Sequence, residues 1–158
     1  MSTEQQADPI DCLLVCSGQL TLLIPSLAVA DVIDLPQLQA LPQAPPWVGG
    51  WALWNDQQVP VLDFEAMQGE REAVIPQQEA LLVILKNGRV EDYQHYAVIA
   101  CGAPRPLTVS AQDQWLGDVS PVVAPGLQMA GRYGGERLLL PDFDEIEQRV
   151  AQIPDVNH

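Results

Sequence analysis

Short apolar runs, each ended by turn-forming residues, are the feature of this sequence that most limits its fold. The 158 residues include 14 prolines and 11 glycines, spread between the apolar runs. Proline lacks a backbone N–H and fixes φ, and glycine weakens helices, so the crossover helices of a parallel α/β sheet have no room here. Many short strands between such turns are typical of small all-β proteins. The sequence therefore predicts an all-β fold, and its periodicity leaves a sandwich and paired barrels equally open.

The apolar runs give the expected strands. They are residues 12–16, 20–24, 47–54, 57–64, 81–85, 96–101, 107–109, 127–133 and 136–140. Tight turns are expected where glycine or asparagine tolerates positive φ, at Gly18-Gln19, Asn55-Asp56, Asn87-Gly88 and Gly134-Gly135. Pro60 cannot donate to a ladder, which predicts a sheet edge or a bulge at that position. The stretch around Pro121 and Pro125 is expected to be a connection.

Two segments stay ambiguous, and one helix is expected. Residues 27–35 fit either a strand or a single helical turn, and 65–79 fit a short helix or an exposed loop. At the end of the chain Asp142 can cap a helix, with Glu145 reaching back to it. The apolar residues of that segment form one helical stripe, which predicts a helix docked on the sheets: Phe143, Ile146, Val150 and Ile153.

Charge and length narrow the possible partners. Seven Lys and Arg against 21 Asp and Glu give a net charge of −14, which disfavours nucleic acid and anionic membrane surfaces because both require clustered cations. Residues 1–9 are polar, without the basic start and apolar run of a secretory signal. The longest apolar runs are far shorter than the ~20 residues of a membrane span. A cytoplasmic protein is expected, with one domain over 10–153 and tails at 1–9 and 154–158.

The cysteines and histidines give little support for a metal site or for catalysis. Cys12 and Cys16 lie about 13 Å apart on an extended strand, too far for a disulfide, and are expected to pack as small apolar groups. With Cys101 and His95 they lack the spacing of a metal site. No motif of a hydrolase, a P-loop or a dinucleotide site surrounds His95, which is interpreted as the polar position before a strand. We therefore expect no catalytic residue, metal or cofactor.

Three tryptophans lie close together in the sequence. On an extended strand Trp47 and Trp51 share one face and Trp54 points to the other, so both faces carry an indole. Core packing accounts for some of these side chains, and an indole at a barrel rim suits a protein interface.

The same region resembles the CheW-like domain family. Residues 41–51 read LPQAPPWVGGW and residues 59–64 read VPVLDF. The family has a proline-containing connector, a strand begun by glycine, a tight hairpin, and a strand reading Pro-Val-Ile/Leu-Asp-Leu/Phe. Weaker similarity extends through 13–32, 81–101 and 134–146, and so over nearly the whole chain.

The resemblance implies a fold and a role. The fold is two intertwined five-stranded SH3-like barrels with a short C-terminal helix. The role is a non-catalytic adaptor that couples the cytoplasmic tip of methyl-accepting chemoreceptors to the regulatory domain of a CheA-type histidine kinase, in the cytoplasm or at membrane-associated arrays. The family has no active site and works through strand edges, barrel ends and the groove between barrels.

Partner-binding residues follow from the resemblance position by position. Val29 and Asp31 match the family's Val-x-Glu contact segment, with Val32 beside them, and Gly50 matches the glycine of the hairpin strand. The alternative for the valines is core packing, and for Gly50 close backbone approach. The other expected partner-binding residues are on the hairpin: Trp51, Trp54 and Asn55.

One departure affects the functional interpretation. The family usually reads Asn-Leu-Arg-Gly at the hairpin tip, and this chain has Asn55 where the arginine stands. Losing a guanidinium removes up to five donors and a fixed charge. The chain therefore resembles divergent, auxiliary CheW-like proteins of type IV pilus systems that control twitching motility, of the ChpC or PilI kind. Two alternatives stay open: a CheW-fold binding module with a different partner, and an enzyme that uses His95 or an acid pair.

Overall fold

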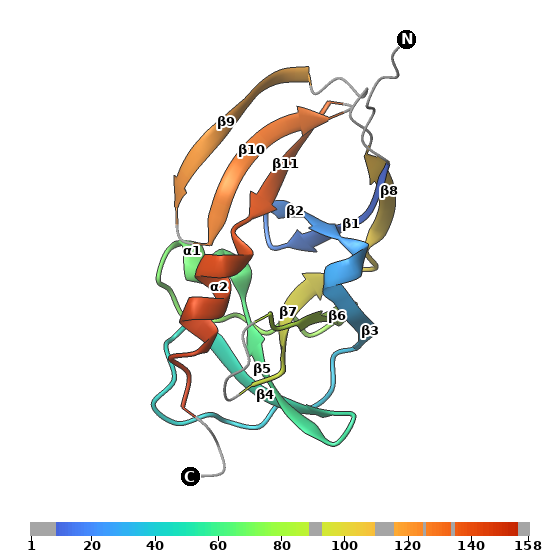
Figure 1. The fold of residues 1–158 in the computed structure, drawn as a ribbon. Helices are drawn as coiled ribbons and strands as arrows, with labels where there is room; N and C mark the ends of the chain where they lie inside the picture. The colour runs from blue at the N-terminus through green and yellow to red at the C-terminus, as the bar shows by residue number, and fades with distance from the viewer. Residues whose placement is uncertain (1–8, 89–92, 110–115, 125, 134, 155–158) are drawn as a thin grey trace.

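The computed structural model describes residues 9–88, 93–109, 116–124, 126–133 and 135–154. Its strands form two sheets (Figure 1). The first sheet has the order β8-β1-β2-β11-β10-β9, with β1 (Ile10–Ser17), β2 (Leu20–Pro25), β8 (Arg105–Val109), β9 (Leu116–Ala124), β10 (Leu127–Tyr133) and β11 (Glu136–Pro141). The second has the order β3-β6-β7-β5-β4, with β3 (Val29–Asp34), β4 (Val48–Trp54), β5 (Gln57–Leu62), β6 (Ala80–Lys86) and β7 (His95–Cys101).

The chain interlocks the two sheets. It begins the first sheet with β1 and β2, completes the second with β3 to β7, and returns for β8 to β11. The parallel pairing of β11 with β2 joins the returning strands to the first hairpin. The expected all-β fold is confirmed, with sheets of five and six described strands because β8 adds to β1 at an edge.

The second sheet curls until its two outer strands approach each other. The connector after β3 forms a bridge to β4, in which Gln39 N donates to Trp51 O at 2.9 Å and Trp51 N donates to Gln39 O at 2.8 Å. Gly50 makes this possible, since its φ is +128° and a Cβ there would collide with the Gln39 carbonyl. The glycine in this strand is therefore required by close backbone approach.

The described apolar residues form three clusters. Neighbouring residues of one strand face different clusters, as expected for a period of two: in β6, Leu82 and Ile84 pack inside the second sheet, whereas Val83 and Leu85 face the first. A third cluster around Leu14 and Leu138 lies within the first sheet. The central cluster takes residues from both sheets and from α2, so the two sheets share part of their core.

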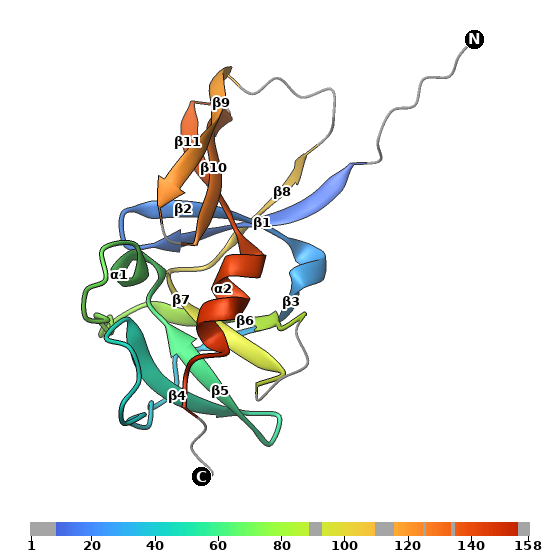
Figure 2. The same ribbon diagram turned by 60° about the vertical axis from the view of Figure 1, so that its left-hand side comes forward.

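Two short helices cover the junction between the sheets. In both views α2 (Phe143–Val150) lies between the first and the second sheet (Figures 1 and 2). Its expected apolar stripe is confirmed, because Ile146, Val150 and Ile153 are buried in the central cluster and Phe143 packs against it. The ambiguous segment after β5 contains α1 (Phe64–Gln68), which Asp63 caps.

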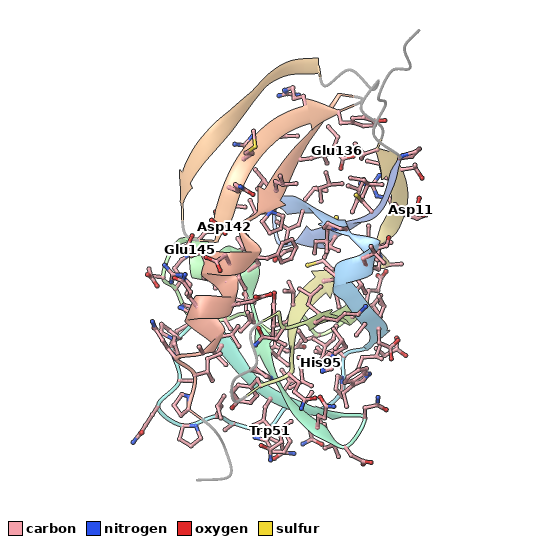
Figure 3. All side chains as sticks on the ribbon, in the orientation of Figure 1. Asp11, Trp51, His95, Glu136, Asp142 and Glu145 are labelled. Carbon is pink, nitrogen blue, oxygen red and sulfur yellow. The ribbon has the colours of Figure 1, made fainter. Side chains whose placement is uncertain are left out.

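The expected capping of α2 is half right. Asp142 Oδ1 accepts the Glu145 N–H at 3.2 Å, as predicted. The reciprocal bond is wrong, because Asp142 N already donates to Gly126 O and Glu145 Oε1 instead accepts from Gly126 N at 3.0 Å. Glu145 therefore ties α2 to the turn between β9 and β10; both acidic residues are labelled in Figure 3.

Some expected strand boundaries need correction. Residues around Pro121 form β9, an edge strand, where a missing N–H costs no ladder bond on the open side. The strand expected over 57–64 ends at Leu62 and a helix begins at Phe64. β5 is an interior strand, but its pairing with β7 begins at Val61, so Pro60 has a ladder partner only in β4.

The turn predictions have mixed outcomes. The hairpins at Gly18-Gln19 and Asn55-Asp56 are confirmed by continuous pairing on both sides. At Asn87-Gly88 the connection extends to residue 94 and is no tight turn; Asn87 N donates to Gln94 O. The last hairpin closes at Tyr133 and Glu136, and Gly134 lies outside the described residues. The segment at 26–34 holds both a 3₁₀ turn, η1 (Ser26–Ala28), and β3.

No helix among the described residues is long and apolar enough to cross a membrane. The three cysteines are free thiols, and Cys12 packs in the cluster within the first sheet, as expected. Burial, and then the charge of Asp11, raises the pKa of the Cys12 thiol. The tails expected at 1–9 and 154–158 fall mostly outside the described residues.

Candidate protein-interaction surface

Asp31 and Trp54, both expected as partner-binding residues, are in direct contact. Trp54 Nε1 donates to Asp31 Oδ2 at 3.0 Å, and Asp31 Oδ1 accepts the Val32 N–H at 2.8 Å. Asp31 lies on β3 and Trp54 on β4, the two outer strands of the second sheet. The contact exists because that sheet curls, and it joins the two segments that carry the expected partner contacts.

Two further residues belong to the same surface and were not expected there. The rings of Trp54 and His95 meet edge to face, with centroids 4.8 Å apart and an interplanar angle of 61°. His95 Nδ1 lies 2.9 Å from Gln57 Oε1, and Gln57 pairs with Trp54 across the hairpin. We call Asp31, Trp54, Gln57 and His95 the indole cluster.

The surroundings of His95 favour its neutral form. Partial burial, and then the positive charge of Lys86 directly opposite on β6, lowers the pKa of His95 below its ordinary value. A neutral imidazole has one nitrogen donor and one acceptor, so it can donate to the Gln57 carbonyl oxygen. Its contacts with an indole and an amide fix the orientation of Trp54, which agrees with a structural role for His95 in this surface.

The hairpin tip next to this cluster is exposed. Asn55 and Asp56 have φ values of +53° and +60°, as a type I′ turn requires. Leu53, just before them, is 65% exposed although it is a large apolar residue. The tip therefore offers apolar area and the Asn55 amide beside the indole cluster, where the family has an arginine.

The remaining expected partner-binding residues are partly or fully buried. Val29 and Val32 are half-buried and pack against the central cluster, and Gly50 is buried under the Gln39 bridge. Trp51 is half-exposed on the other face of β4 from Trp54 (Figure 3 labels Trp51).

The expected shared face of Trp47 and Trp51 is wrong. Trp47 precedes β4 and is buried in the central cluster, with 3% of its area exposed. A register shift between Val48 and Gly50 inserts an irregularity between the two tryptophans, so simple alternation fails there.

The indole cluster offers hydrogen-bonding groups and two aromatic rings. Two pockets lie away from this cluster. One of about 400 Å³ is lined by Asp34, Leu35, residues 76–81, Gly102 and Ala103, and one of about 320 Å³ lies against β10 and β11. Among the residues that the structure describes, no three His, Cys, Asp or Glu side chains gather as metal ligands. Directional donors, an indole and exposed strand edges suit contact with another protein.

Comparison with known proteins identifies the family. A family model described as the CheW-like domain matches residues 11–156. The chain belongs to the CheW-like domain family. Its members have the double SH3-like barrel fold, which the sheets described above follow.

A solved structure agrees with this membership. The scaffolding protein TtCheW from Thermoanaerobacter tengcongensis has a crystal structure that superposes on this CheW-like chain with a TM-score of 0.67, covering 90% of each chain at 10% sequence identity. At that identity the likeness shows the fold. No curated protein sequence matches the chain.

Proposed function

We propose that this CheW-like chain is a non-catalytic adaptor that couples chemoreceptors to a CheA-type histidine kinase. The observation that carries the proposal is the Asp31–Trp54 hydrogen bond, because it joins β3 and the β4–β5 hairpin into one surface. These are the two segments in which the family resemblance places partner contacts. Membership of a family of scaffolds supports a coupling role.

Within this surface the residues have different roles. Trp54 and Leu53 supply apolar area and act as contact residues, since partly exposed indoles commonly anchor protein interfaces. Asp31 acts as a positioning residue, because Trp54 Nε1 and Val32 N already occupy both of its oxygens. Val29, Val32, Gly50 and Trp51 hold the strands that carry these contacts.

The wider setting follows from the family. We place the protein in the cytoplasm, with residues 10–153 as the adaptor domain, recruited to arrays at chemoreceptor tips. Asn55 in place of the family's arginine supports an auxiliary member of a type IV pilus system. The same substitution favours a second candidate, a CheW-fold module whose partner is neither receptor nor kinase, because the tip lacks the guanidinium that the usual coupling employs.

Calorimetric titration tests the first candidate. The purified chain is titrated with the regulatory domain of the CheA-type kinase from its own cell, and separately with the receptor tip. Micromolar or tighter binding, about −8 kcal/mol, is expected. Trp54→Ala should weaken binding at least about tenfold, and Asp31→Asn less, because asparagine keeps one acceptor for the indole.

The control variants distinguish an error in the proposed coupling role from an error in the proposed binding surface. Gln128→Ala, at an exposed position on β10, should bind as the unchanged protein does. Absence of binding to both the kinase domain and the receptor tip would rule out the coupling role and favour the second candidate. Full binding by Trp54→Ala would show that the indole cluster is the wrong surface.

A further inference from the structure

Two arginines face each other on the last hairpin. The β10–β11 register places Arg132 directly opposite Arg137, and both are exposed. Residues directly opposite in antiparallel strands have Cβ atoms about 4.5–5.5 Å apart, so two guanidinium groups share one small area. Like charges in this arrangement destabilise a sheet.

Neither arginine is neutralised within the described residues. Arg132 Nη1 donates only to the backbone Gly135 O, at 3.3 Å, and no carboxylate of the described chain lies within ion-pair distance of Arg132 or Arg137. The contrast is with Arg105, which pairs with Glu136 at 2.8 Å, and with Arg149, which lies 3.3 Å from Glu145. This chain therefore does pair arginines with carboxylates elsewhere.

Composition makes the arginine pair unusual. The chain has seven basic and 21 acidic residues, so an acidic side chain opposite an arginine would be the common arrangement. A feature that breaks a local stabilising rule, with no compensating contact among the residues that the structure describes, is a candidate for function. Two carboxylates would neutralise the two guanidinium groups, and a partner protein can supply them.

We propose that the Arg132–Arg137 pair is a docking site for an acidic segment of another protein. Each guanidinium can hold one carboxylate through two parallel N–H···O bonds. Carboxylates at alternate positions of an extended segment are about 6.6 Å apart, a spacing that two flexible arginine side chains on adjacent strands can meet. The site thus recognises paired acidic side chains.

The arginine pair lies far from the indole cluster, so both sites can be occupied at the same time. Glu136, the neighbour of Arg137, lies at the far end of the first sheet, whereas Trp51 of the β4–β5 hairpin lies at the opposite end of the molecule (Figure 3). An acidic partner on the arginine pair would not cover the indole cluster. The proposal is therefore independent of the identity of the partners at that cluster.

Fluorescence anisotropy with a labelled peptide of alternating glutamate and threonine tests the site. The measurement is made at about 0.1 M salt, where the Debye length of roughly 10 Å screens repulsion from the distant acidic surface but not contact pairs. We expect saturable binding below about 1 mM, and none of the matching glutamine peptide. Arg137→Glu should weaken binding at least about fivefold.

A charge-matched control and a stability measurement complete the test. Arg71→Glu changes the net charge by the same amount away from the hairpin and should leave binding unchanged. Arg137→Glu should also raise the melting temperature, because it replaces an Arg–Arg pair by an Arg–Glu pair. Unaltered binding by Arg137→Glu, failure of the unchanged protein to bind at about 1 mM, or tighter binding of a DNA oligonucleotide than of the peptide would each overturn the proposal.

Discussion

The carboxylate of Asp31 has both oxygens engaged, one by the Trp54 indole and one by the Val32 amide. An exposed strand edge with a bonded N–H is less open to unwanted pairing, so Asp31 protects β3 as well as orienting the indole. His95 completes the arrangement from β7, its ring against the indole and its Nδ1 at Gln57. At the scale of single residues, the surface is therefore pre-ordered by its own hydrogen bonds.

The environment of His95 predicts a pH dependence of stability. Because folding lowers its pKa below 6.5, the unfolded chain binds more protons around pH 6. The free energy of unfolding linked to His95 is therefore highest above the pKa of the unfolded chain, and it decreases as the pH falls toward the pKa of the folded protein. Urea unfolding at about pH 7.5 and about pH 5.5 should show a larger loss of stability for the unchanged protein than for His95→Gln. Equal losses would contradict the neutral-imidazole assignment.

At the scale of elements, the β4–β5 hairpin depends on two backbone positions. Gly50 lets the Gln39 connector close the second sheet, and the Asn55-Asp56 turn carries two residues with positive φ. Asparagine and aspartate tolerate this conformation, but glycine adopts it without steric cost. The hairpin tip is therefore less stable than a type I′ turn with glycine at one of these two positions.

Asp56→Gly should stabilise the hairpin. Relief of the positive φ at Asp56 is expected to add about 0.5–1 kcal/mol, because Asn-Gly is the preferred type I′ pair. For a chain of this size the melting temperature should rise by about 1–4 °C, measured by circular dichroism. Asp56→Asn, which removes the charge and keeps a side chain, separates strain from electrostatics. A gain equal to that of Asp56→Asn would assign the effect to charge.

At the scale of the whole molecule, the central cluster joins the two sheets. It includes Leu22 of β2, Val83 of β6 and Ile146 of α2, each at most 1% exposed. Tyr93 OH also donates to Pro154 O at 2.7 Å, which ties the segment after α2 to the loop before β7. Because the sheets share this core, they are expected to unfold together.

Ile146→Ala tests this coupling. Truncation of a buried isoleucine should cost about 2–5 kcal/mol. Urea transitions followed by tryptophan fluorescence and by circular dichroism should shift together and coincide. Leu27→Ala, at a side chain that is 86% exposed, should change stability by less than about 0.5 kcal/mol. Two separated transitions would show that the sheets are independent units.

Local signals accounted for much of the fold. Most of the expected strands, the turns at Gly18-Gln19 and Asn55-Asp56, and the apolar stripe of α2 follow from propensity and periodicity, which act over a few residues. β9 was missed because proline within a run argues against a strand until its place at a sheet edge is known. Of the candidate site, Asp31 came from the family resemblance and Trp54 from the alternation of tryptophans along a strand. Their contact came from the curvature of the sheet.

By itself, the sequence determined the all-β class, the main turns and the family, because these depend on local patterns of apolar, turn-forming and motif residues. Only the tertiary structure decided which strands became neighbours, how β3 and β4 met, and where His95 and the Arg132–Arg137 pair lay. Pairing between distant strands depends on long-range packing and register, and a period of two cannot encode either one.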